Sequence, residues 1–273
     1  MKTEGIPFIP EDTELTSDVL KAQEESFKKL LDKIMKKADE YNVTIRVIGS
    51  LAFRIQCPDY KYIEYENKRY LTDIDFIAYS KEIVEVDDMF RDMGWEENMN
   101  VLRLFGDKRR IFYHPNKNIH SDVFIDKLRF CHDINFKNRL EIAYPTISLV
   151  DLLLEKLQIV KINKKDLVDI MVLLSQYQVS DDGSSKDVIN GKYVAKLCSK
   201  DWGWWKTATT NIEKAKSFTK DYLDSKDKKK VSYRLDTLSH LIGKKKKTLL
   251  WKLRSLFGEK ISWYREVEEV ERD

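Results

Sequence analysis

The chain has 273 residues, of which 42% are hydrophobic and 35% are charged, and its formal net charge at pH 7 is +3. It is long enough to bury one large core or two smaller ones. Its cysteines, Cys57, Cys131 and Cys198, are far apart and odd in number, which argues against a disulfide framework and a zinc site. No segment has the roughly 18 consecutive apolar residues of a membrane span, so we expect a cytoplasmic protein that does not contact a membrane.

Charge is distributed unevenly along the chain. Residues 1–183 are acidic on balance, residues 184–260 are strongly basic, and residues 261–273 are acidic again. This asymmetry is typical of a protein in which one part holds cations and another contacts a polyanion. A lysine-rich surface that is simply solvated explains the basic part equally well, and both interpretations stay open.

The spacing of hydrophobic residues predicts the elements of the first half. A long amphipathic helix is predicted over residues 20–41 and a half-buried strand over 43–47. Gly49-Ser50 then forms a tight turn before a helix start at 51–55, and residues 57–71 form a loop or small hairpin. The remaining predictions are a strand at 73–79, a helix at 84–93 ended by Gly94, and strands at 101–105, 110–113 and 121–125, the first two joined by a Gly106-Asp107 turn.

After Pro145 the sequence becomes helical in character. Ser148 is a good cap for a helix that continues through Leu157, and a second helix is predicted over residues 165–177. Residues 181–185 are the best linker candidate, and helices are expected from there to residue 257, with breaks at 224–225 and Gly243. The predicted fold is α+β: a small mixed sheet flanked by helices over 1–145, a helical extension over 146–180, and a basic helical domain over 186–273.

Three aspartates are the strongest candidates for chemistry. Asp73 and Asp75 are two residues apart on a predicted strand, so both side chains leave the same face. Asp122, on a later predicted strand, can supply a third carboxylate if that strand is a neighbour in the sheet. Carboxylates forced together need a cation, and Mg²⁺ or Mn²⁺ takes oxygen ligands while leaving positions for phosphate oxygens. On this hypothesis Asp122 also orients or deprotonates an attacking hydroxyl.

Gly49-Ser50 supplies the complementary feature. A glycine between a buried strand and a helix lets the backbone approach a ligand, and the Ser50 hydroxyl together with helix N-terminal N–H groups can hold phosphate oxygens. A Gly-Ser turn alone carries little weight, and an Asp-x-Asp alone is more often an exposed acidic pair. The ordered combination of the turn, the Asp-x-Asp strand and the later aspartate is what indicates a nucleotide site.

That ordered set resembles the nucleotidyltransferase superfamily of the DNA polymerase β type. The residues that match its pattern are Val47-Ile-Gly-Ser50, Thr72-Asp-Ile-Asp-Phe76 and Asp122. The resemblance implies that Asp73, Asp75 and Asp122 bind the metal and act in catalysis. The distance in sequence between Ser50 and Asp73 is longer than is common in the superfamily, so an insertion over residues 57–71 is assumed.

A second resemblance covers residues 149–177. Leu152 to Val160 and Lys165 to Ile170 resemble the helical segment of AbiEii-type nucleotidyltransferases, many of which are toxins of toxin–antitoxin pairs. The resemblance implies that this segment completes the nucleotide site: Lys156 neutralises triphosphate charge, and Lys165, Asp166 and Asp169 line or brace the site. It also implies a possible antitoxin partner. Without the upstream motif, Lys156 is more simply a snorkelling lysine on a leucine-rich helix.

Weaker candidates lie outside this set. Arg69 can contact a phosphate of the nucleotide or acceptor, although a solvated arginine is the simpler interpretation. His114, His120 and His132 lack ligand spacing, and His120 alone is a minor candidate for contact with substrate. The aromatic cluster 202–205 stacks a base or, more simply, anchors a helical core. The lysine runs 228–230 and 244–247 support binding of a polyanion only weakly.

The predicted activity is transfer of a nucleoside monophosphate from a nucleoside triphosphate to an acceptor, with release of pyrophosphate. The acceptor stays open between two classes. An RNA end, tRNA in particular, suits the basic region, and a small hydroxylated molecule such as an aminoglycoside suits the same core. A catalytically silent nucleotide- or RNA-binding module and a helical adaptor are the alternatives from other classes. Both leave the three carboxylates poorly explained.

Overall fold

The computed structural model describes residues 7–10, 12–115, 119–181, 187–223 and 225–267. The chain divides into two compact units. Unit 1 comprises Met1–Leu128 and Asn135–Ser148, and unit 2 comprises Arg129–Ile134 and Leu149–Asp273. The chain therefore enters unit 2 briefly at residues 129–134 before it returns to unit 1. Among the described residues, no helix combines the length and the apolar character that a membrane crossing requires.

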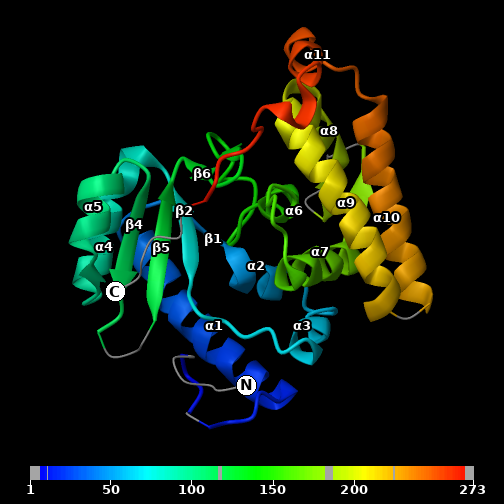
Figure 1. Cartoon of the computed structure of the whole chain (residues 1–273). Coiled ribbons are helices and arrows are strands. Elements are labelled where there is room, and N and C mark those ends of the chain that lie inside the picture. Colours follow the sequence, from blue (N-terminus) through cyan, green and yellow to red (C-terminus); the bar gives the residue numbers. More distant parts are fainter. Residues whose placement is uncertain (1–6, 11, 116–118, 182–186, 224, 268–273) are drawn as a thin grey trace. The chain divides into compact units, whose positions relative to one another are not determined.

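Unit 1 contains a mixed five-stranded sheet in the order β1-β2-β5-β4-β3 (Figure 1). The β2–β5 pair is parallel, and the β1–β2, β4–β5 and β3–β4 pairs are antiparallel. This arrangement confirms the α+β class and the small mixed sheet with helices. The strands are β1 (Ile45–Ile48), β2 (Asp75–Ala78), β3 (Glu96–Glu97), β4 (Arg109–Tyr113) and β5 (His120–Ile125).

Two helices of unit 1 lie close to their predicted ranges, 20–41 and 84–93. Helix α1 begins after Thr16, whose side chain accepts a hydrogen bond from the Val19 N–H at 3.3 Å, and its apolar stripe is buried. Helix α4 ends before Gly94, which has a φ of +77°. The helices are α1 (Ser17–Glu40), α2 (Gly49–Gln56), α3 (Tyr62–Glu66), α4 (Ile83–Asp92) and α5 (Met99–Phe105). The predicted strand, Gly-Ser turn and helix start around residue 49 are confirmed.

The predicted strand over residues 101–105 is wrong, because this segment is helix α5. The Asn98 side chain accepts hydrogen bonds from the Asn100 and Val101 N–H groups, each at 3.0 Å, and so caps the helix. Only Val101 is buried in the helix, while Leu104 is 72% exposed. The other apolar residues of this segment, which predicted a strand, are half-buried or exposed. The Gly106-Asp107 turn consequently joins a helix to β4.

Residues 57–71 carry the short helix α3, and a buried arginine holds this segment to α1. The Arg54 guanidinium donates to Glu64 and, at 3.1 Å, to Glu24. Burial alone would raise the pKa of Glu24, but hydrogen bonds from four side chains outweigh that effect and lower the pKa to about 2. The donors are Lys28, Lys61, Tyr65 and Arg54. The inserted segment is thus fixed by charge as well as by packing.

Unit 2 is mainly helical (Figure 1). Its core is formed by apolar faces of α6 to α10, with Leu152, Ile170, Val194, Ile212 and Leu235 all fully buried. A short parallel pair, β8 (Gln178–Ser180) and β9 (Val188–Asn190), was not predicted. The helices are α6 (Leu149–Leu157), α7 (Lys164–Gln176), α8 (Gly191–Lys200), α9 (Trp202–Tyr222), α10 (Ser225–Lys244) and α11 (Leu249–Ser255). Of the predicted linker 181–185, residues 182–185 lie outside the described residues.

Two further pairings complete the secondary structure. Strands β6 (Lys127–Arg129) and β7 (Asp133–Asn135) form a separate two-stranded sheet. Within unit 1, Val47 exchanges backbone hydrogen bonds with Pro145 and Ile147, at 2.9 and 3.2 Å, so the segment before α6 lies beside β1. Helices α6 and α7, predicted as an extension of the sheet domain, pack against α8, α9 and α10.

Candidate active site

Parallel pairing of β2 and β5 puts the candidate carboxylates on one face of the sheet. Phe76 pairs with Val123, and the Ile74 N–H donates to the His120 carbonyl at 3.5 Å, so the same register continues before β2 begins. Asp75 is therefore the neighbour of Asp122, and Asp73 is the neighbour of His120. Because aligned residues of parallel strands point to the same side, the three aspartates share a face; their spacing predicted this only for Asp73 and Asp75.

Gly49 lies beside this acidic face, directly after the end of β1. Ile48, the last residue of β1, pairs with Asp75, and Gly49 follows with a φ of +69°, a conformation that side-chain-bearing residues rarely adopt. A Cβ at Gly49 would lie 3.2 Å from Asp75 Oδ2. Glycine is thus needed both for the turn and for the approach of the backbone to the carboxylate. Ser50 follows in the first turn of α2, where it is partly exposed.

Asp122 is engaged by an arginine that sequence analysis did not select. The Arg109 guanidinium donates a hydrogen bond to Asp122 Oδ2, and the aspartate side chain is only 4% exposed. Arg109 pairs with Phe124 on β5, and Asp122 pairs with Ile111 on β4, so the two side chains meet diagonally on the same face. The alternation of Arg109, Ile111 and Tyr113 along β4 was the available signal, because it puts Arg109 on the face of Asp122.

His120 also lies on this face, close to one of the three candidate aspartates. Its Nε2 lies 3.6 Å from Asp73 Oδ2, and both side chains are about equally shielded, at 16% and 15% exposed. His120 was a minor candidate because no histidine pair has ligand spacing. Its position two residues before Asp122 on β5 brings it to Asp73. On this face the three aspartates are therefore accompanied by the Arg109 guanidinium and the His120 imidazole.

The arrangement fits a cation only in part. Among the described residues, no three His, Cys, Asp or Glu side chains are grouped as a metal site would require. Asp73 and Asp75 supply the hard oxygen donors that Mg²⁺ and Mn²⁺ take, whereas Asp122 already bonds to Arg109. A cation at this face would take its oxygen donors from the Asp-x-Asp pair, Asp73 and Asp75.

Lys156, Asp166 and Asp169 form an ion-pair cluster inside unit 2. Lys156 Nζ lies 2.8 Å from Asp169 Oδ2 and 3.2 Å from Asp166 Oδ1, and the lysine side chain is 10% exposed. Asp166 also closes a capping box with Asn163 at the start of α7. In the structure these three residues join α6 to α7. Their contacts correspond to the bracing role rather than to a lysine presented to phosphate.

The remaining candidates are Lys165 and Arg69. Lys165 is exposed in the first turn of α7, where its backbone N–H donates to Asn163 Oδ1 at 2.8 Å. Arg69 is half-buried in unit 1, and its carbonyl oxygen accepts a hydrogen bond from the Arg54 guanidinium. The Arg69 backbone is therefore anchored at the insertion. The positions of Lys165 and Arg69 do not by themselves support a contact with phosphate.

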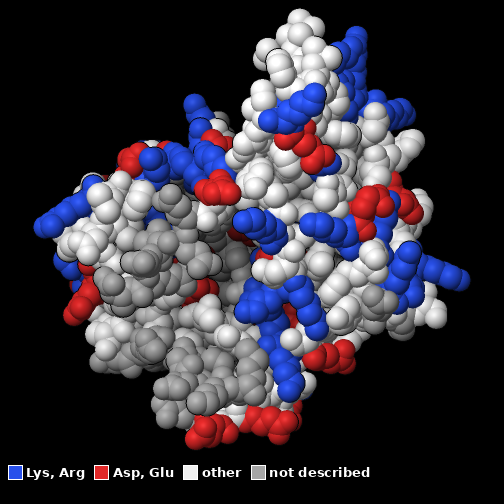
Figure 2. Space-filling view, in the orientation of Figure 1, with Lys and Arg blue, Asp and Glu red and all other residues white. Residues whose placement is uncertain are grey.

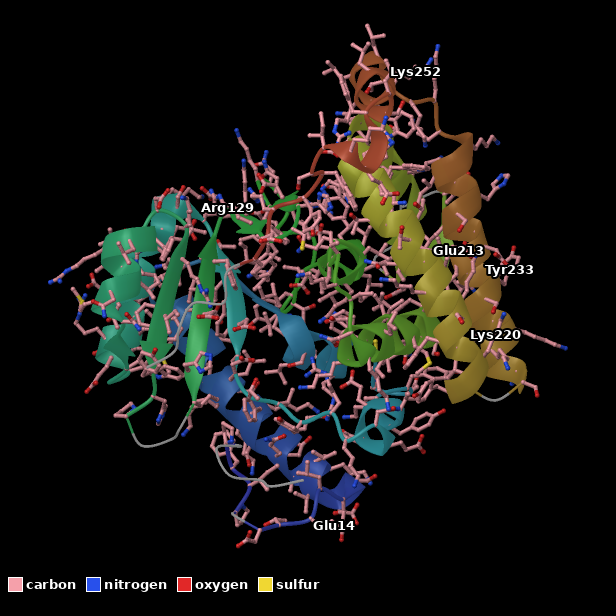
Figure 3. All side chains as sticks on the ribbon, viewed as in Figure 1. Glu14, Arg129, Glu213, Lys220, Tyr233 and Lys252 are labelled. Carbon is pink, nitrogen blue, oxygen red and sulfur yellow. The ribbon has the colours of Figure 1, made fainter. Side chains whose placement is uncertain are left out.

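Basic side chains of unit 2 are dispersed. Figure 2 shows blue side chains over the helical unit interspersed with red ones. Lys252, on α11, and Lys220, near the end of α9, are both exposed and lie at opposite ends of the unit (Figure 3). The predicted lysine-rich surface is present, and it does not form one continuous patch on the face in view.

Comparisons with protein-family models, curated proteins and solved structures find no match to this chain.

Proposed function

We propose that the protein is a metal-dependent nucleotidyltransferase that uses the face formed by β1, β2 and β5. The observation that carries the proposal is the contact of the left-handed Gly49 with Asp75, the neighbour of Asp122 across the parallel β2–β5 pair. The order of these features along the chain supports it further: a strand, a Gly-Ser turn, a helix, an Asp-x-Asp strand and a strand with a third aspartate. Each feature has a use in binding and positioning a triphosphate.

On this proposal Asp73 and Asp75 bind the divalent cation and Gly49-Ser50 holds phosphate oxygens. A bound Mg²⁺ or Mn²⁺ would neutralise the triphosphate and the pyrophosphate leaving group. Arg109 turns from Asp122 to the triphosphate, since a guanidinium recognises phosphate oxygens through two parallel N–H donors. Asp122 is then available to orient the acceptor hydroxyl and accept its proton. His120 stays beside Asp73 and limits the approach of water.

The proposed acceptor is an RNA end. The basic composition of residues 184–260 supports an anionic acceptor, because each lysine or arginine that neutralises a phosphate releases counterions on binding. A small hydroxylated acceptor remains the competing proposal for the same catalytic face. Affinity for RNA that falls steeply with salt concentration favours the first, and salt-independent transfer to a small molecule favours the second.

One observation favours a second candidate function, a nucleotide-binding module without transferase activity. The Arg109–Asp122 ion pair uses the carboxylate that the transfer reaction needs. If Arg109 keeps this contact when a nucleotide binds, the face binds the triphosphate and no hydroxyl is activated. The two functions differ in turnover, not in nucleotide binding.

Metal-dependent nucleotide binding tests the shared part of both candidates. Titration calorimetry with ATP and Mn²⁺ should give binding to the wild type that Asp75→Asn weakens at least tenfold. Asp107→Asn is the matched control, since Asp107 is an exposed aspartate of the same unit, with a side chain that is 73% exposed. Equal affinities of the wild type and Asp75→Asn would overturn the proposal.

A further inference from the structure

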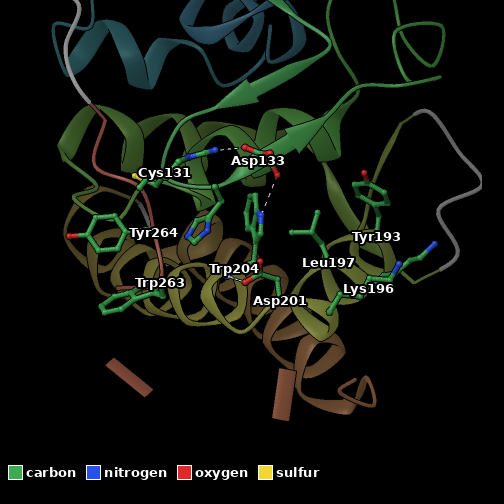
Figure 4. Close-up of a pocket in the computed structure, with 12 residues that line it drawn as sticks. Cys131, Asp133, Tyr193, Lys196, Leu197, Asp201, Trp204, Trp263 and Tyr264 are labelled. Atoms are coloured by element: carbon green, nitrogen blue, oxygen red, sulfur yellow. Dashed lines mark hydrogen bonds and ion pairs between the residues drawn. The ribbon is translucent and has the colours of Figure 1, made fainter. Parts of the chain in front are cut away.

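Unit 2 contains a cavity of about 710 Å³ that the proposed catalytic face does not use. All of its lining residues belong to this unit. The volume lies in the range of about 300–1,000 Å³ that is typical of small-molecule sites. The residues that give it chemical character are Tyr193, Lys196, Lys200, Trp204, Trp263 and Tyr264. Figure 4 shows Trp263 and Tyr264 at one side, Tyr193 and Lys196 at the other, and Trp204 between them.

The aromatic side of the cavity is held in place by specific contacts. The Trp263 indole N–H donates to Thr207 Oγ1 at 3.1 Å, and the same hydroxyl lies 2.9 Å from His132 Nε2. The Trp204 indole N–H donates to the Asp133 carbonyl at 3.3 Å. Because Thr207 and His132 are buried, the bond to Thr207 fixes the orientation of the Trp263 ring, and the bond to the Asp133 carbonyl orients the Trp204 ring. Flat, preorganised rings suit stacking on a planar ligand.

Gly203 explains how the segment carrying Trp263 reaches this position. A Cβ at Gly203 would lie 2.4 Å from the Trp263 carbonyl oxygen and 3.3 Å from His132 Cε1. Only glycine therefore lets residues 262–264 lie against the first turn of α9. The glycine of the Trp-Gly-Trp-Trp sequence is therefore explained by this close packing, which a hydrophobic core alone would not require.

The charges of the cavity select an anion. Lys196 and Lys200 are one helical turn apart on α8, are exposed, and have no ion pair with any described carboxylate. The two acids that line the cavity are already engaged: Asp133 pairs with Arg265, and the Asp201 carboxylate caps α9 by accepting the Trp204 N–H at 3.0 Å. The surplus positive charge therefore lies on α8, and Figure 4 shows Lys196 across the cavity from Trp263 and Tyr264.

We infer that this cavity binds a nucleotide unit, with the base against the indole side and the phosphate on Lys196 and Lys200. A planar ring and a dianion joined by a sugar match the two sides of the cavity, and stacking on aromatic side chains accepts any base. The nucleotide comes from free nucleoside monophosphate or from the end of an RNA strand, which share this chemistry. The inference does not rest on the proposed transferase function.

Binding is tested with AMP, adenosine and a 5′-phosphorylated hexa-adenylate, followed by tryptophan fluorescence in the presence of EDTA. EDTA removes metal-dependent binding to unit 1, and Asp75→Asn should keep its affinity for AMP. The Lys196→Ala/Lys200→Ala protein should bind AMP at least tenfold more weakly and adenosine unchanged. Lys192→Ala, an exposed lysine one turn earlier on α8, should behave like the wild type.

The aromatic side is tested separately. Trp263→Leu should weaken AMP and adenosine alike by at least fivefold, and Tyr264→Leu replaces it if the first variant does not fold by circular dichroism. Tighter binding of the oligonucleotide than of AMP identifies an RNA end as the source, and equal or weaker binding identifies the free nucleotide. Failure of AMP and the oligonucleotide to bind at millimolar concentration, or unchanged AMP affinity in the double lysine variant, would overturn the inference.

Discussion

Gly49 and Asp75 are in close contact where β1 passes into α2, since a Cβ at Gly49 would lie 3.2 Å from Asp75 Oδ2. Gly49→Ala should therefore reduce the free energy of unfolding through both backbone strain and crowding. Gly94→Ala is the matched control, because Gly94 also has a positive φ and a Cβ there meets nothing within 4 Å. We expect a loss of about 1–2 kcal/mol from strain in both variants.

The Gly49 variant should lose more than the Gly94 variant in urea unfolding, and it alone should lose metal-dependent ATP binding. Equal losses with normal ATP binding in both proteins would show that the approach of Gly49 to Asp75 has no functional role.

The Arg109–Asp122 ion pair gives a second prediction. Arg109→Gln removes the guanidinium from a buried carboxylate, so the free energy of unfolding should fall by about 3 kcal/mol. If the acidic face binds a divalent cation, Mn²⁺ should recover more stability in this variant than in the wild type. Thermal unfolding with and without Mn²⁺ measures both effects. Arg103→Gln, at an exposed position of α5, controls for loss of charge, and a smaller Mn²⁺ shift in Arg109→Gln than in the wild type would contradict the assignment.

Replacing Lys156 distinguishes a structural role, in which the lysine joins α6 to α7, from a role in phosphate binding. Because Asp169 is fully buried, Lys156→Met should cost about 3–5 kcal/mol of stability, and the double variant Lys156→Met/Asp169→Leu should recover much of it. Denaturant unfolding measures the coupling, and the exposed Lys165→Met is the control. If Lys156→Met leaves stability unchanged but weakens ATP binding, the lysine contacts phosphate as the family resemblance implies.

His132 predicts a pH dependence for unit 2. Burial lowers its pKa to about 4 from an ordinary value of 6.5, so the folded state disfavours the protonated ring. Below pH 6.5 the unfolded chain binds a proton that the folded chain does not, and stability should fall between pH 6.5 and 4 by about 3 kcal/mol. Above pH 6.5 both states are neutral and the effect vanishes.

Urea unfolding of wild type and His132→Asn at pH 7 and pH 4.5 measures this contribution, with the exposed His240→Asn as control. His132→Asn should lose less stability on acidification than the wild type. The same loss in all three proteins would assign the pH dependence to other groups.

Much of the fold was predictable because local patterns and tertiary burial agree. The buried stripe of α1, the alternation of apolar residues leading into β1 and the glycine after α4 are each compatible with one local structure. The strand prediction within segment 99–105 was wrong because a single buried residue is compatible with a strand period of two and with a helix period of 3.6. The Asn98 side chain caps this segment and favours the helix. The short β8–β9 pair depends on a partner ten residues away and has no strong local signal.

The aspartates of the candidate site could be predicted from the sequence, but the basic side chains that lie beside them could not. The spacing of Asp73 and Asp75 fixes a shared face, but the identity of the neighbouring strand decides which basic residues meet them. Arg109 and His120 reach the aspartates only through the order β2-β5-β4, which sequence spacing does not encode. Likewise, the role of the tryptophan cluster depends on residues 262–264, far along the chain.

Transfer of label from α-labelled nucleoside triphosphates is the measurement that tests the central claim most directly. The wild type is incubated with Mg²⁺ and each triphosphate, with total RNA and with a pool of small hydroxylated metabolites, beside Asp75→Asn and Asp107→Asn. We predict label on one acceptor class for wild type and Asp107→Asn, and none for Asp75→Asn. Equal transfer by Asp75→Asn, or metal-dependent nucleotide binding without transfer to either pool, would contradict the assignment as a nucleotidyltransferase.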